Sequence, residues 1–506
     1  MLSGTTIAAF AVMLSLQGPL AAADPLEPFD NYINVAMKEW RVPGAAVSIV
    51  KDGKVVLSRG YGVRKLGDKQ RVNAETLFPL ASITKNFTAT ALALLVEEGR
   101  LAWDDAVTKH LPNVKFPDAY RTEHLTIRDL LCHRTGLERG DLLPRRADVS
   151  IDAVVRRVRF LQPASEFRAK WGYNNLMYYV AGAVAAKVTD SSWEDLIAKR
   201  LLNPLEMKST ATAAGRVQSE NRAYRHRLLD DKVIPAALEE ARIGVSPAGS
   251  MQSNAGDMAN WLLAALADDD TRSSLLKQST RREMQSMQMS IPVTWGRTGN
   301  PYAARFYGWG LGWTVLDYQG RKLCYHAGSS GTMLAIMPEE NIGVVILTNQ
   351  EWTSLAGMLM YDVLDAYLSG PNKAWDRDKW AFWKESDTHP DVGRQRALKQ
   401  AESKRKADTP AALPLSSYAG RYQCDLYGDL IVIHDSGKLT LRYGKNKPAS
   451  VTHWEGDTFY IRRPVDDDAN VDWLVSFEAD GERTTSLSIE RLGWHEVLPR
   501  FVRVDD

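Results

Sequence analysis

Ser82 and Lys85 are the residues whose types and spacing most directly suggest chemistry in this chain. Because they are three positions apart, their side chains lie on the same face of a helix. A serine hydroxyl becomes a good nucleophile when a base accepts its proton, and a partly desolvated lysine can lose its charge near neutral pH and act as that base. The N-terminus of a helix also favours negative charge on the serine oxygen. We therefore interpret Ser82 as a candidate nucleophile and Lys85 as its candidate base.

The same spacing recurs at Ser274 and Lys277 and at Ser403 and Lys406, so the pair alone is a weak indicator. The first of these pairs follows an acidic run, and the second lies in a charged segment. Neither begins an apolar helix. The assignment of Ser82 therefore depends on the residues that accompany it.

The segment 78–100 predicts a buried helix that carries Ser82 near its start. Pro79 sets a turn, and the strong helix formers alanine and leucine dominate residues 89–95. Gly99 stands where a helix prefers a left-handed terminal residue. The helix is apolar on nearly every face, which is typical of a helix inside a sizeable domain.

Tyr173 and Asn175 lie just before a second apolar helix, expected from Leu176. A tyrosine close to a cationic lysine holds its phenolate more easily and can relay a proton to a leaving group. The alternative is a core tyrosine followed by a capping asparagine, and the sequence leaves both open. Tyr32 and Asn34 have the same spacing but precede the first strand, where we expect simple packing.

His326, Gly328 and Ser329 lie at the end of a predicted strand, and His326-Ala-Gly328 is the only His-x-Gly in the chain. A glycine lets a substrate backbone lie close to the strand, and an N–H group on that edge can face a carbonyl oxygen. A lone histidine at a strand end is more often structural. Its assignment therefore depends on the other motifs.

Two groups of predicted strands enclose a long, mostly helical region. β-Branched runs on both sides of Asp52-Gly53 predict a hairpin within residues 45–60. Four later apolar runs predict antiparallel strands at residues 310–316, 322–326, 333–337 and 344–348. Strands from both ends of a domain with helices between them imply an α+β fold, an antiparallel sheet flanked by helices.

The length of 506 residues suggests two or more domains. Lysine plus arginine at 63 against aspartate plus glutamate at 62 gives a net charge of +1, without a basic block that would indicate nucleic acid. The 3 cysteines are widely spaced and the 9 histidines are scattered, so neither a disulfide framework nor a zinc pattern is indicated.

The N-terminal residues 1–23 resemble a secretory signal peptide. Residues 7–16 are apolar, and Ala21-Ala22-Ala23 offers a small-residue cleavage site before Asp24. The first residues lack lysine and arginine, so a retained N-terminal anchor is the alternative. No later stretch is long and apolar enough to span a bilayer. We expect a periplasmic or secreted protein without a stable membrane span.

The pattern changes after the α+β domain, which we place at residues 24–370. Residues 371–414 are rich in tryptophan and then in charged residues, and we interpret them as a partly helical linker. Residues 415–506 show short alternating strands typical of a small antiparallel β-barrel, at 430–434, 438–443, 457–461, 473–478 and 486–491. The barrel aromatics Trp454, Phe459, Trp473 and Phe477 are expected in its core rather than against a ligand. Our hypothesis is that the barrel overhangs the catalytic cleft and limits substrate size.

The three motifs, Ser82-Ile-Thr-Lys85, Tyr173-Asn-Asn175 and His326-Ala-Gly328, resemble in this order those of the serine β-lactamase and penicillin-binding-protein superfamily. The resemblance is strongest to the class C-like branch, with its S12-type peptidases and family VIII esterases, and covers roughly residues 30–370. Residues 125–137, 203–207 and 250–258 also resemble connecting segments of that branch. Residues 418–422 and 453–459 resemble the lipocalin-like domain attached to many such hydrolases.

The resemblance implies a two-step acyl transfer. Ser82 would attack a carbonyl carbon, and Lys85 and Tyr173 would pass its proton to the leaving group before water releases the acyl group. The backbone N–H groups of Ser82 and Ser329 would form the oxyanion hole. Asn175 would orient Lys85 and the substrate amide. No metal ion or organic cofactor is implied.

One departure from the family pattern concerns the substrate. β-Lactamases and penicillin-binding proteins usually carry Lys-Thr-Gly on this strand, whereas here His326 replaces the lysine, and an unperturbed imidazole is mostly neutral at pH 7. This argues against penicillins as the main substrate and towards peptides, amides or esters. Within the family, His-x-Gly looks more like the peptidase branch, so we favour a serine peptidase acting on small or linear peptides, including peptides with D-residues. The runner-up is a carboxylesterase or transesterase of the same fold. The alternative of another class is a non-catalytic binding protein. The expected partner is a small-molecule or peptide substrate, and the oligomeric state is left open.

Overall fold

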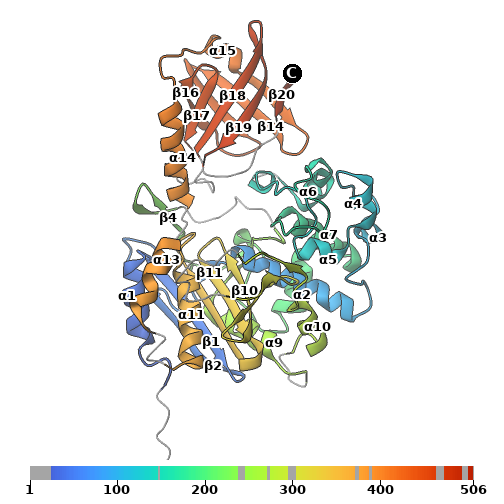
Figure 1. Ribbon diagram of the computed structural model, residues 1–506, viewed down its shortest axis with the longest axis vertical. Helices are drawn as coiled ribbons and strands as arrows, with labels where there is room; N and C mark the ends of the chain where they lie inside the picture. The colour runs from blue at the N-terminus through green and yellow to red at the C-terminus, as the bar shows by residue number, and fades with distance from the viewer. Residues whose placement is uncertain are drawn as a thin grey trace, which may run out of the picture.

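The computed structural model describes residues 24–145, 149–236, 246–269, 274–293, 304–370, 375–386, 390–462, 472–492 and 500–504 (Figure 1). The predicted signal peptide, residues 1–23, lies outside the described residues. The chain forms an α+β domain and a separate C-terminal barrel, as Figure 1 shows. The predicted fold class is therefore confirmed.

An eight-stranded sheet in the order β2-β1-β12-β11-β10-β9-β8-β7 forms the centre of the α+β domain, and all neighbouring strands are antiparallel. The strands are β1 (Gly44–Lys51), β2 (Lys54–Gly62), β7 (Met289–Ser290), β8 (Tyr307–Trp309), β9 (Thr314–Tyr318), β10 (Arg321–Gly328), β11 (Thr332–Met337) and β12 (Ile342–Thr348). Strands from the beginning and the end of the domain meet where β1 pairs with β12.

The predicted hairpin at Asp52-Gly53 is confirmed. Both residues have positive φ angles, 50° and 71°, as a two-residue type I′ turn requires. The strand predicted over residues 310–316 is wrong in its first half, because residues 310–313 form the turn between β8 and β9. Gly312 has φ of 82° there, and a Cβ on Gly310 would lie 2.3 Å from the carbonyl oxygen of Met284. The two glycines therefore belong to a tight turn.

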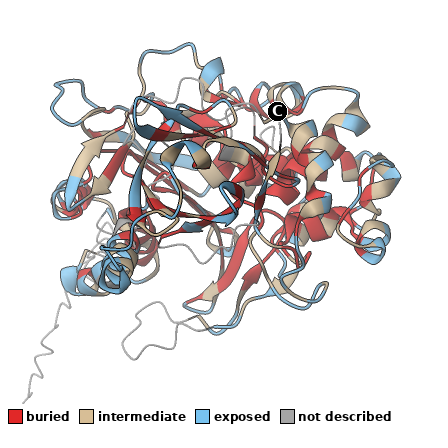
Figure 2. Ribbon diagram, turned by 90° about the horizontal axis from the view of Figure 1, so that it is seen from above, coloured by how far each residue is buried: buried red, intermediate tan, exposed pale blue. Residues whose placement is uncertain are grey.

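Two helical layers cover the two faces of the sheet. Val345 and Leu347 of β12 pack on one face with α2 (Thr84–Glu97) and α9 (Ala255–Leu266). Val344 and Ile346 pack on the other face with α1 (Phe29–Glu39), α11 (Leu355–Leu368) and α13 (Trp380–Ser386). Because alternate residues of a strand face opposite sides, a two-sided core requires a strand like β12, which is buried at every position and apolar at all but Thr348. Figure 2 shows buried residues concentrated in the central strands and helices.

The helical region between the early and late strands carries the candidate nucleophile. Its helices are α2 (Thr84–Glu97), α3 (Val107–His110), α4 (Ala119–His124), α5 (Ile127–Leu131), α6 (Ile151–Arg157), α7 (Leu176–Thr189), α8 (Trp193–Ile197), α9 and α10 (Gln278–Met284). The helix expected from Leu176 is α7. Gly99, with φ of 68°, ends α2 in a Schellman motif, in which the N–H of Arg100 bonds to the carbonyl of Leu95 at 3.0 Å.

Eight antiparallel strands close the C-terminal barrel, with β13 pairing back to β20. They are β13 (Gly420–Cys424), β14 (Gly428–Asp435), β15 (Lys438–Tyr443), β16 (Ala449–Glu455), β17 (Thr458–Arg462), β18 (Asp472–Asp480), β19 (Arg483–Arg491) and β20 (Phe501–Val504). Three of the predicted core aromatics, Phe459, Trp473 and Phe477, are buried inside. The fourth, Trp454, instead packs outside the barrel with Ala397 and Leu398 of α14 (Pro390–Lys404).

The linker segment contains α13 and α14, so its predicted partly helical character is confirmed in its described residues. Trp380 of α13 is buried and donates a hydrogen bond to the hydroxyl of Tyr32 at 2.7 Å. Tyr32 in turn donates to Asp362 at 2.8 Å, so Tyr32 packs in the core as expected, whereas Asn34 is exposed. Across the part of the chain that the structure describes, no helix combines the length and apolar character needed to cross a bilayer.

Candidate active site

Ser82 lies in a short 3-10 turn, Ala81–Ile83, immediately before α2. The preceding residue, Ala81, has φ of 46°, a left-handed conformation that is strained for most residues other than glycine. The turn is held on one side by the N–H of Leu80, which bonds to the carbonyl of Met251 at 2.8 Å. On the other side, the hydroxyl of Ser330 bonds to the carbonyl of Pro79 at 2.7 Å. The serine is therefore presented on a braced, strained turn.

Ser82 contacts two of the predicted catalytic residues. Lys85 Nζ lies 3.2 Å from Ser82 Oγ, and the hydroxyl of Tyr173 donates a hydrogen bond to the same oxygen at 2.9 Å. The structure thus brings together three residues from segments that are 91 positions apart. This geometry allows the serine hydroxyl to exchange a proton with either group.

Lys85 is fully buried, and its Nζ donates a second hydrogen bond to the carbonyl of Ala248 at 2.7 Å. Burial lowers the pKa of Lys85 well below its usual range; the negative charge of Asp141 opposes this shift and the positive charge of Arg139 adds to it. The same burial raises the pKa of Tyr173 above its usual value. Lys85 is therefore the group suited to be the base, and the tyrosine keeps its proton rather than holding a phenolate.

The side chain of Asn175 hydrogen-bonds to Asp141 rather than to Lys85. Its Nδ2 donates to Asp141 Oδ1 at 2.8 Å, and the other oxygen of Asp141 accepts from Arg139 Nε at 2.6 Å. The predicted orientation of Lys85 comes instead from the carbonyl of Ala248. The asparagine that caps α7 is Asn174, whose side-chain oxygen accepts from the N–H of Leu176 at 2.9 Å.

His326 and Gly328 lie on the stretch of β10 that faces the Ser82 turn. The pairing of β9 with β10 ends at Tyr325, so residues 326–328 have no β9 partner. A Cβ on Gly328 would lie 2.4 Å from the carbonyl oxygen of Leu80, so only glycine allows this approach. Ser329 follows in an exposed turn, and its carbonyl accepts from the N–H of Trp352 at 3.0 Å.

The protonation of His326 follows from its contacts. Its Nδ1 lies 2.8 Å from the carbonyl oxygen of Gly312, and because that oxygen only accepts, Nδ1 carries the proton and Nε2 presents a lone pair. Burial, together with the charge of Lys85, lowers the pKa of His326 to about 3. The ring is therefore neutral at pH 7, and it cannot replace the fixed positive charge of a lysine.

His133 is a residue that sequence reasoning missed. Its ring lies 4.4 Å from the ring of Tyr173 and 4.8 Å from that of Trp309, measured between centroids. Its Nδ1 accepts a hydrogen bond from the N–H of Asn174 at 3.1 Å, and its carbonyl accepts from the N–H of Gly172 at 2.8 Å. Burial lowers its pKa well below the usual value. His133 thus supports the backbone on both sides of Tyr173.

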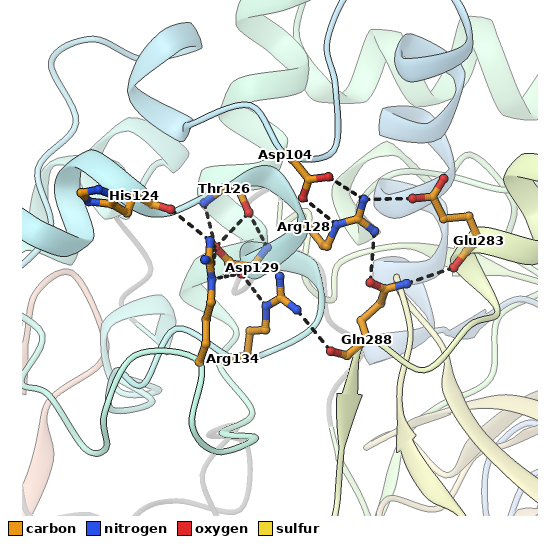
Figure 3. A network of polar contacts seen from close by, with 9 residues as sticks. Asp104, His124, Thr126, Arg128, Asp129, Arg134, Glu283 and Gln288 are labelled. Atoms are coloured by element: carbon orange, nitrogen blue, oxygen red, sulfur yellow. Dashed lines mark hydrogen bonds and ion pairs between the residues drawn. The ribbon is translucent and has the colours of Figure 1, made fainter.

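A network of charged residues holds the segments that carry His133 and Tyr173 (Figure 3). The fully buried Asp129 accepts hydrogen bonds from Arg134 Nε at 2.5 Å, Arg168 Nη2 at 2.7 Å and Thr126 Oγ1 at 2.8 Å. Burial alone would raise the pKa of Asp129, but the two arginines and the backbone N–H of Thr126, which donates at 3.0 Å, together lower it. Arg134 also bonds to the carbonyl of Gln288 at 3.2 Å. The network fixes the segments that carry His133 and Tyr173.

Comparison with known proteins places this geometry in a family. The family model described as Beta-lactamase matches residues 29–365, and a model described as Domain of unknown function (DUF3471) matches residues 404–500. "Unguisins hydrolase ungD'" of Aspergillus campestris is 28% identical over 460 residues, covering 85% of this chain and 82% of that relative. The octameric penicillin-binding protein homologue from Pyrococcus abyssi has a TM-score of 0.59 and 22% identity, covering 94% of this chain and 100% of that one. A D-stereospecific amidohydrolase from Streptomyces sp. has a TM-score of 0.53 and 23% identity, covering 67% of this chain and 98% of that one. The chain therefore belongs to the Beta-lactamase family, and it is a hydrolase of that fold.

Proposed function

We propose that this protein is a serine hydrolase that cleaves amide bonds in small or linear peptides, including peptides with D-residues, through an acyl-enzyme on Ser82. The observation that carries the proposal is the contact of Ser82 Oγ with both the buried Lys85 Nζ at 3.2 Å and the hydroxyl of Tyr173 at 2.9 Å. A buried amine of low pKa beside a serine is the arrangement that activates the hydroxyl.

The chemistry follows from the protonation of these groups. Neutral Lys85 accepts the proton of Ser82 as the serine oxygen attacks the carbonyl carbon, and the N–H groups of Ser82 and Ser329 receive the developing oxyanion. Tyr173 donates its proton to the leaving nitrogen, and protonated Lys85 replaces it, so the C–N bond breaks and an ester to Ser82 remains. Water then attacks that ester, returns one proton through Lys85 to Ser82, and releases the acid.

The substrate class follows from His326. The ring of His326 is buried and neutral, so it places no positive charge beside Ser82 to attract a substrate carboxylate, as a lysine would. The name of the Aspergillus relative describes it as a hydrolase of unguisins, and the Streptomyces neighbour is described as a D-stereospecific amidohydrolase. The Aspergillus name supports hydrolysis in general, and the Streptomyces description supports amide hydrolysis in particular.

The test compares the wild type with Ser82→Ala on peptides of L- and D-residues and on short-chain p-nitrophenyl esters, with Ser274→Ala as the matched control. We expect peptide cleavage to fall by about 10³-fold or more in Ser82→Ala and to stay unchanged in Ser274→Ala. Cleavage of esters alone would move the assignment to the esterase. Binding without turnover in both wild type and variant would favour the non-catalytic binding protein.

We also propose that the protein acts in the periplasm or outside the cell, a proposal supported by the apolar run at residues 7–16 and the small residues before Asp24. N-terminal sequencing of the protein from its native host tests this. A mature chain that begins at Asp24 supports export, and a chain that keeps residues 1–23 contradicts cleavage.

A further inference from the structure

Arg394 of α14 joins three parts of the molecule. Its Nη1 contacts Asp472 Oδ2, at the start of β18 in the barrel, at 2.5 Å. Its Nη2 contacts Asp230 Oδ1 at 2.9 Å, at the tip of the hairpin formed by β4 (His226–Leu229) and β5 (Lys232–Pro235) of the α+β domain. The side chains of Arg394 and Asp472 are each 4% exposed. One buried guanidinium therefore links the barrel, the connecting helix and the α+β domain.

The hairpin tip is a firm attachment point. Asp230 and Asp231 have φ angles of 48° and 61°, the conformation of a two-residue type I′ turn. The neighbouring Asp231 accepts two hydrogen bonds from Arg41, at 2.9 Å to its carbonyl oxygen and 3.0 Å to Oδ1. The hairpin is thus held by an arginine from the α+β domain as well as by Arg394.

The base of this hairpin leads to one side of the active site. Arg227 Nε contacts Glu351 Oε2 at 3.0 Å, and the N–H of Glu351 bonds to the carbonyl of His226 at 3.0 Å. The next residue, Trp352, donates its N–H to the carbonyl of Ser329 at 3.0 Å. Contacts therefore connect the hairpin to the turn that carries Ser329.

The barrel is attached to the other side of the active site by separate contacts. The hydroxyl of Tyr443 donates to the carbonyl of Leu142 at 3.3 Å, and Arg157 Nη1 donates to the carbonyl of Leu426 at 3.0 Å. Leu142 follows Asp141, the residue that accepts from Asn175. Figure 1 shows this arrangement, with α14 descending from the barrel beside β4 and with β14 facing the region of α6.

We propose that Arg394 is a positioning residue that determines substrate length, because it fixes the barrel across the approach to Ser82. The barrel is held on the Asn175 side by Tyr443 and Arg157 and on the Ser329 side by Arg394. A guanidinium that bonds two carboxylates has defined directions, and a buried carboxylate that loses this partner is poorly tolerated. Loss of Arg394 frees one side of the barrel and admits longer peptides. The proposal rests on the proposed peptide hydrolysis.

The experiment compares Arg394→Met with Arg396→Met, because Arg396 is an exposed residue on the same helix. The readout is the ratio of kcat/KM for a long peptide to that for a dipeptide. We expect Arg394→Met to raise this ratio roughly 3- to 30-fold, mainly through KM for the long peptide, while kcat for the dipeptide stays within about twofold. Arg396→Met should leave the ratio unchanged, and Arg394→Lys should restore part of the selectivity. An unchanged ratio in folded Arg394→Met overturns the proposal.

Two further measurements test the role of Arg394 even if Arg394→Met does not fold or the wild type cleaves no peptide. Asp230→Asn weakens the contact of Arg394 with the hairpin and leaves that with Asp472, at a residue whose side chain is 57% exposed, so it serves if Arg394→Met does not fold. It should change the ratio in the same direction, and no change overturns the proposal. Small-angle X-ray scattering is independent of activity. A larger radius of gyration for Arg394→Met supports the fixing role even if no peptide is cleaved by the wild type, whereas an identical scattering curve contradicts it.

Discussion

Three regions of the molecule carry the same Ser-x-x-Lys spacing, and the surroundings of the first are opposite to those of the other two. At residues 82–85 the lysine is fully buried and lies 3.2 Å from the serine oxygen. At residues 274–277 the lysine is exposed, and Ser274 donates instead to the carbonyl of Leu276 at 2.9 Å. Ser403 likewise donates to the carbonyl of Gln400 at 2.8 Å rather than to Lys406. The comparison teaches that burial and bracing of the pair, not its spacing, create a candidate nucleophile.

Replacing Lys85 should have the largest effect on activity. Lys85→Met removes the base while keeping an unbranched chain, and we expect kcat/KM for a peptide to fall by about 10³-fold or more. Lys277→Met and Lys406→Met should retain wild-type kcat/KM, because neither lysine contacts its serine. Steady-state kinetics on the three variants provide the measurement. A comparable loss in either control would show that the spacing matters without burial.

The mutation of the tyrosine should have the next largest effect. Tyr173→Phe removes the hydroxyl that donates to Ser82 at 2.9 Å, and we expect a loss of about 10²- to 10³-fold in kcat. Tyr32→Phe is the matched control, because its hydroxyl bonds to Asp362 in the core. That change should lower the free energy of unfolding by about 1–3 kcal/mol and leave kcat unchanged. Urea unfolding and kinetics on both variants separate the two roles.

The burial of Lys85 also predicts a pH dependence. The neutral amine is the base, so kcat/KM should rise as pH increases through the lowered pKa of Lys85 and should reach its plateau below the usual lysine value.

The stability of the protein should change with pH in the same direction. Because the folded-state pKa is lower than the unfolded one, the unfolded chain binds more protons between the two values, and the free energy of unfolding rises with pH there by about 1.4 kcal/mol per unit. Urea unfolding of wild type and Lys85→Met at several pH values isolates the contribution of Lys85 to this pH dependence of the free energy of unfolding. Parallel curves for the two proteins would contradict it.

The smallest expected effect concerns specificity. His326→Lys restores the positive charge of the family pattern, and we expect the preference for a peptide with a free carboxylate over its amide to rise by about tenfold. His326→Gln, which stays neutral, should not change this preference. The measurement is the ratio of kcat/KM values for the two peptides. An equal shift in both variants would mean that charge at this position does not select the substrate.

Much of the fold followed from patterns that are local in the sequence. The Asp52-Gly53 turn, the apolar α7 and the almost wholly apolar β12 each carry their own signal, and the structure contains all three. In the barrel, β16 was missed because most of its residues are exposed or half-buried, which weakens the alternation that marks a strand. The strands β13 and β20, which close the barrel by pairing with each other, also lay outside the predicted set.

The candidate site could be predicted only where residues fall in short motifs. Ser82, Lys85 and Tyr173 meet as their motifs suggested. The carbonyl of Ala248, which bonds Lys85, and the carboxylate of Asp141, which bonds Asn175, come from loops without a local signal. His133 lay inside the segment 125–137 that resembled the family, but only its contacts with Tyr173 reveal what it supports. Burial of Lys85, the property that lowers its pKa, is set by the whole domain and cannot be obtained from spacing.

The most direct test of this account is to locate the acyl group that forms during turnover. Wild-type protein is mixed with p-nitrophenyl acetate, quenched rapidly in acid and mapped by peptide mass spectrometry, alongside Lys85→Met. The account predicts rapid, saturable acetylation of Ser82 in the wild type, none on Ser274 or Ser403, and little acetylation of Ser82 in the variant. Acetylation of Ser274 or Ser403 at a similar rate, or equal acetylation of Ser82 without Lys85, would contradict the claim that the buried lysine activates Ser82.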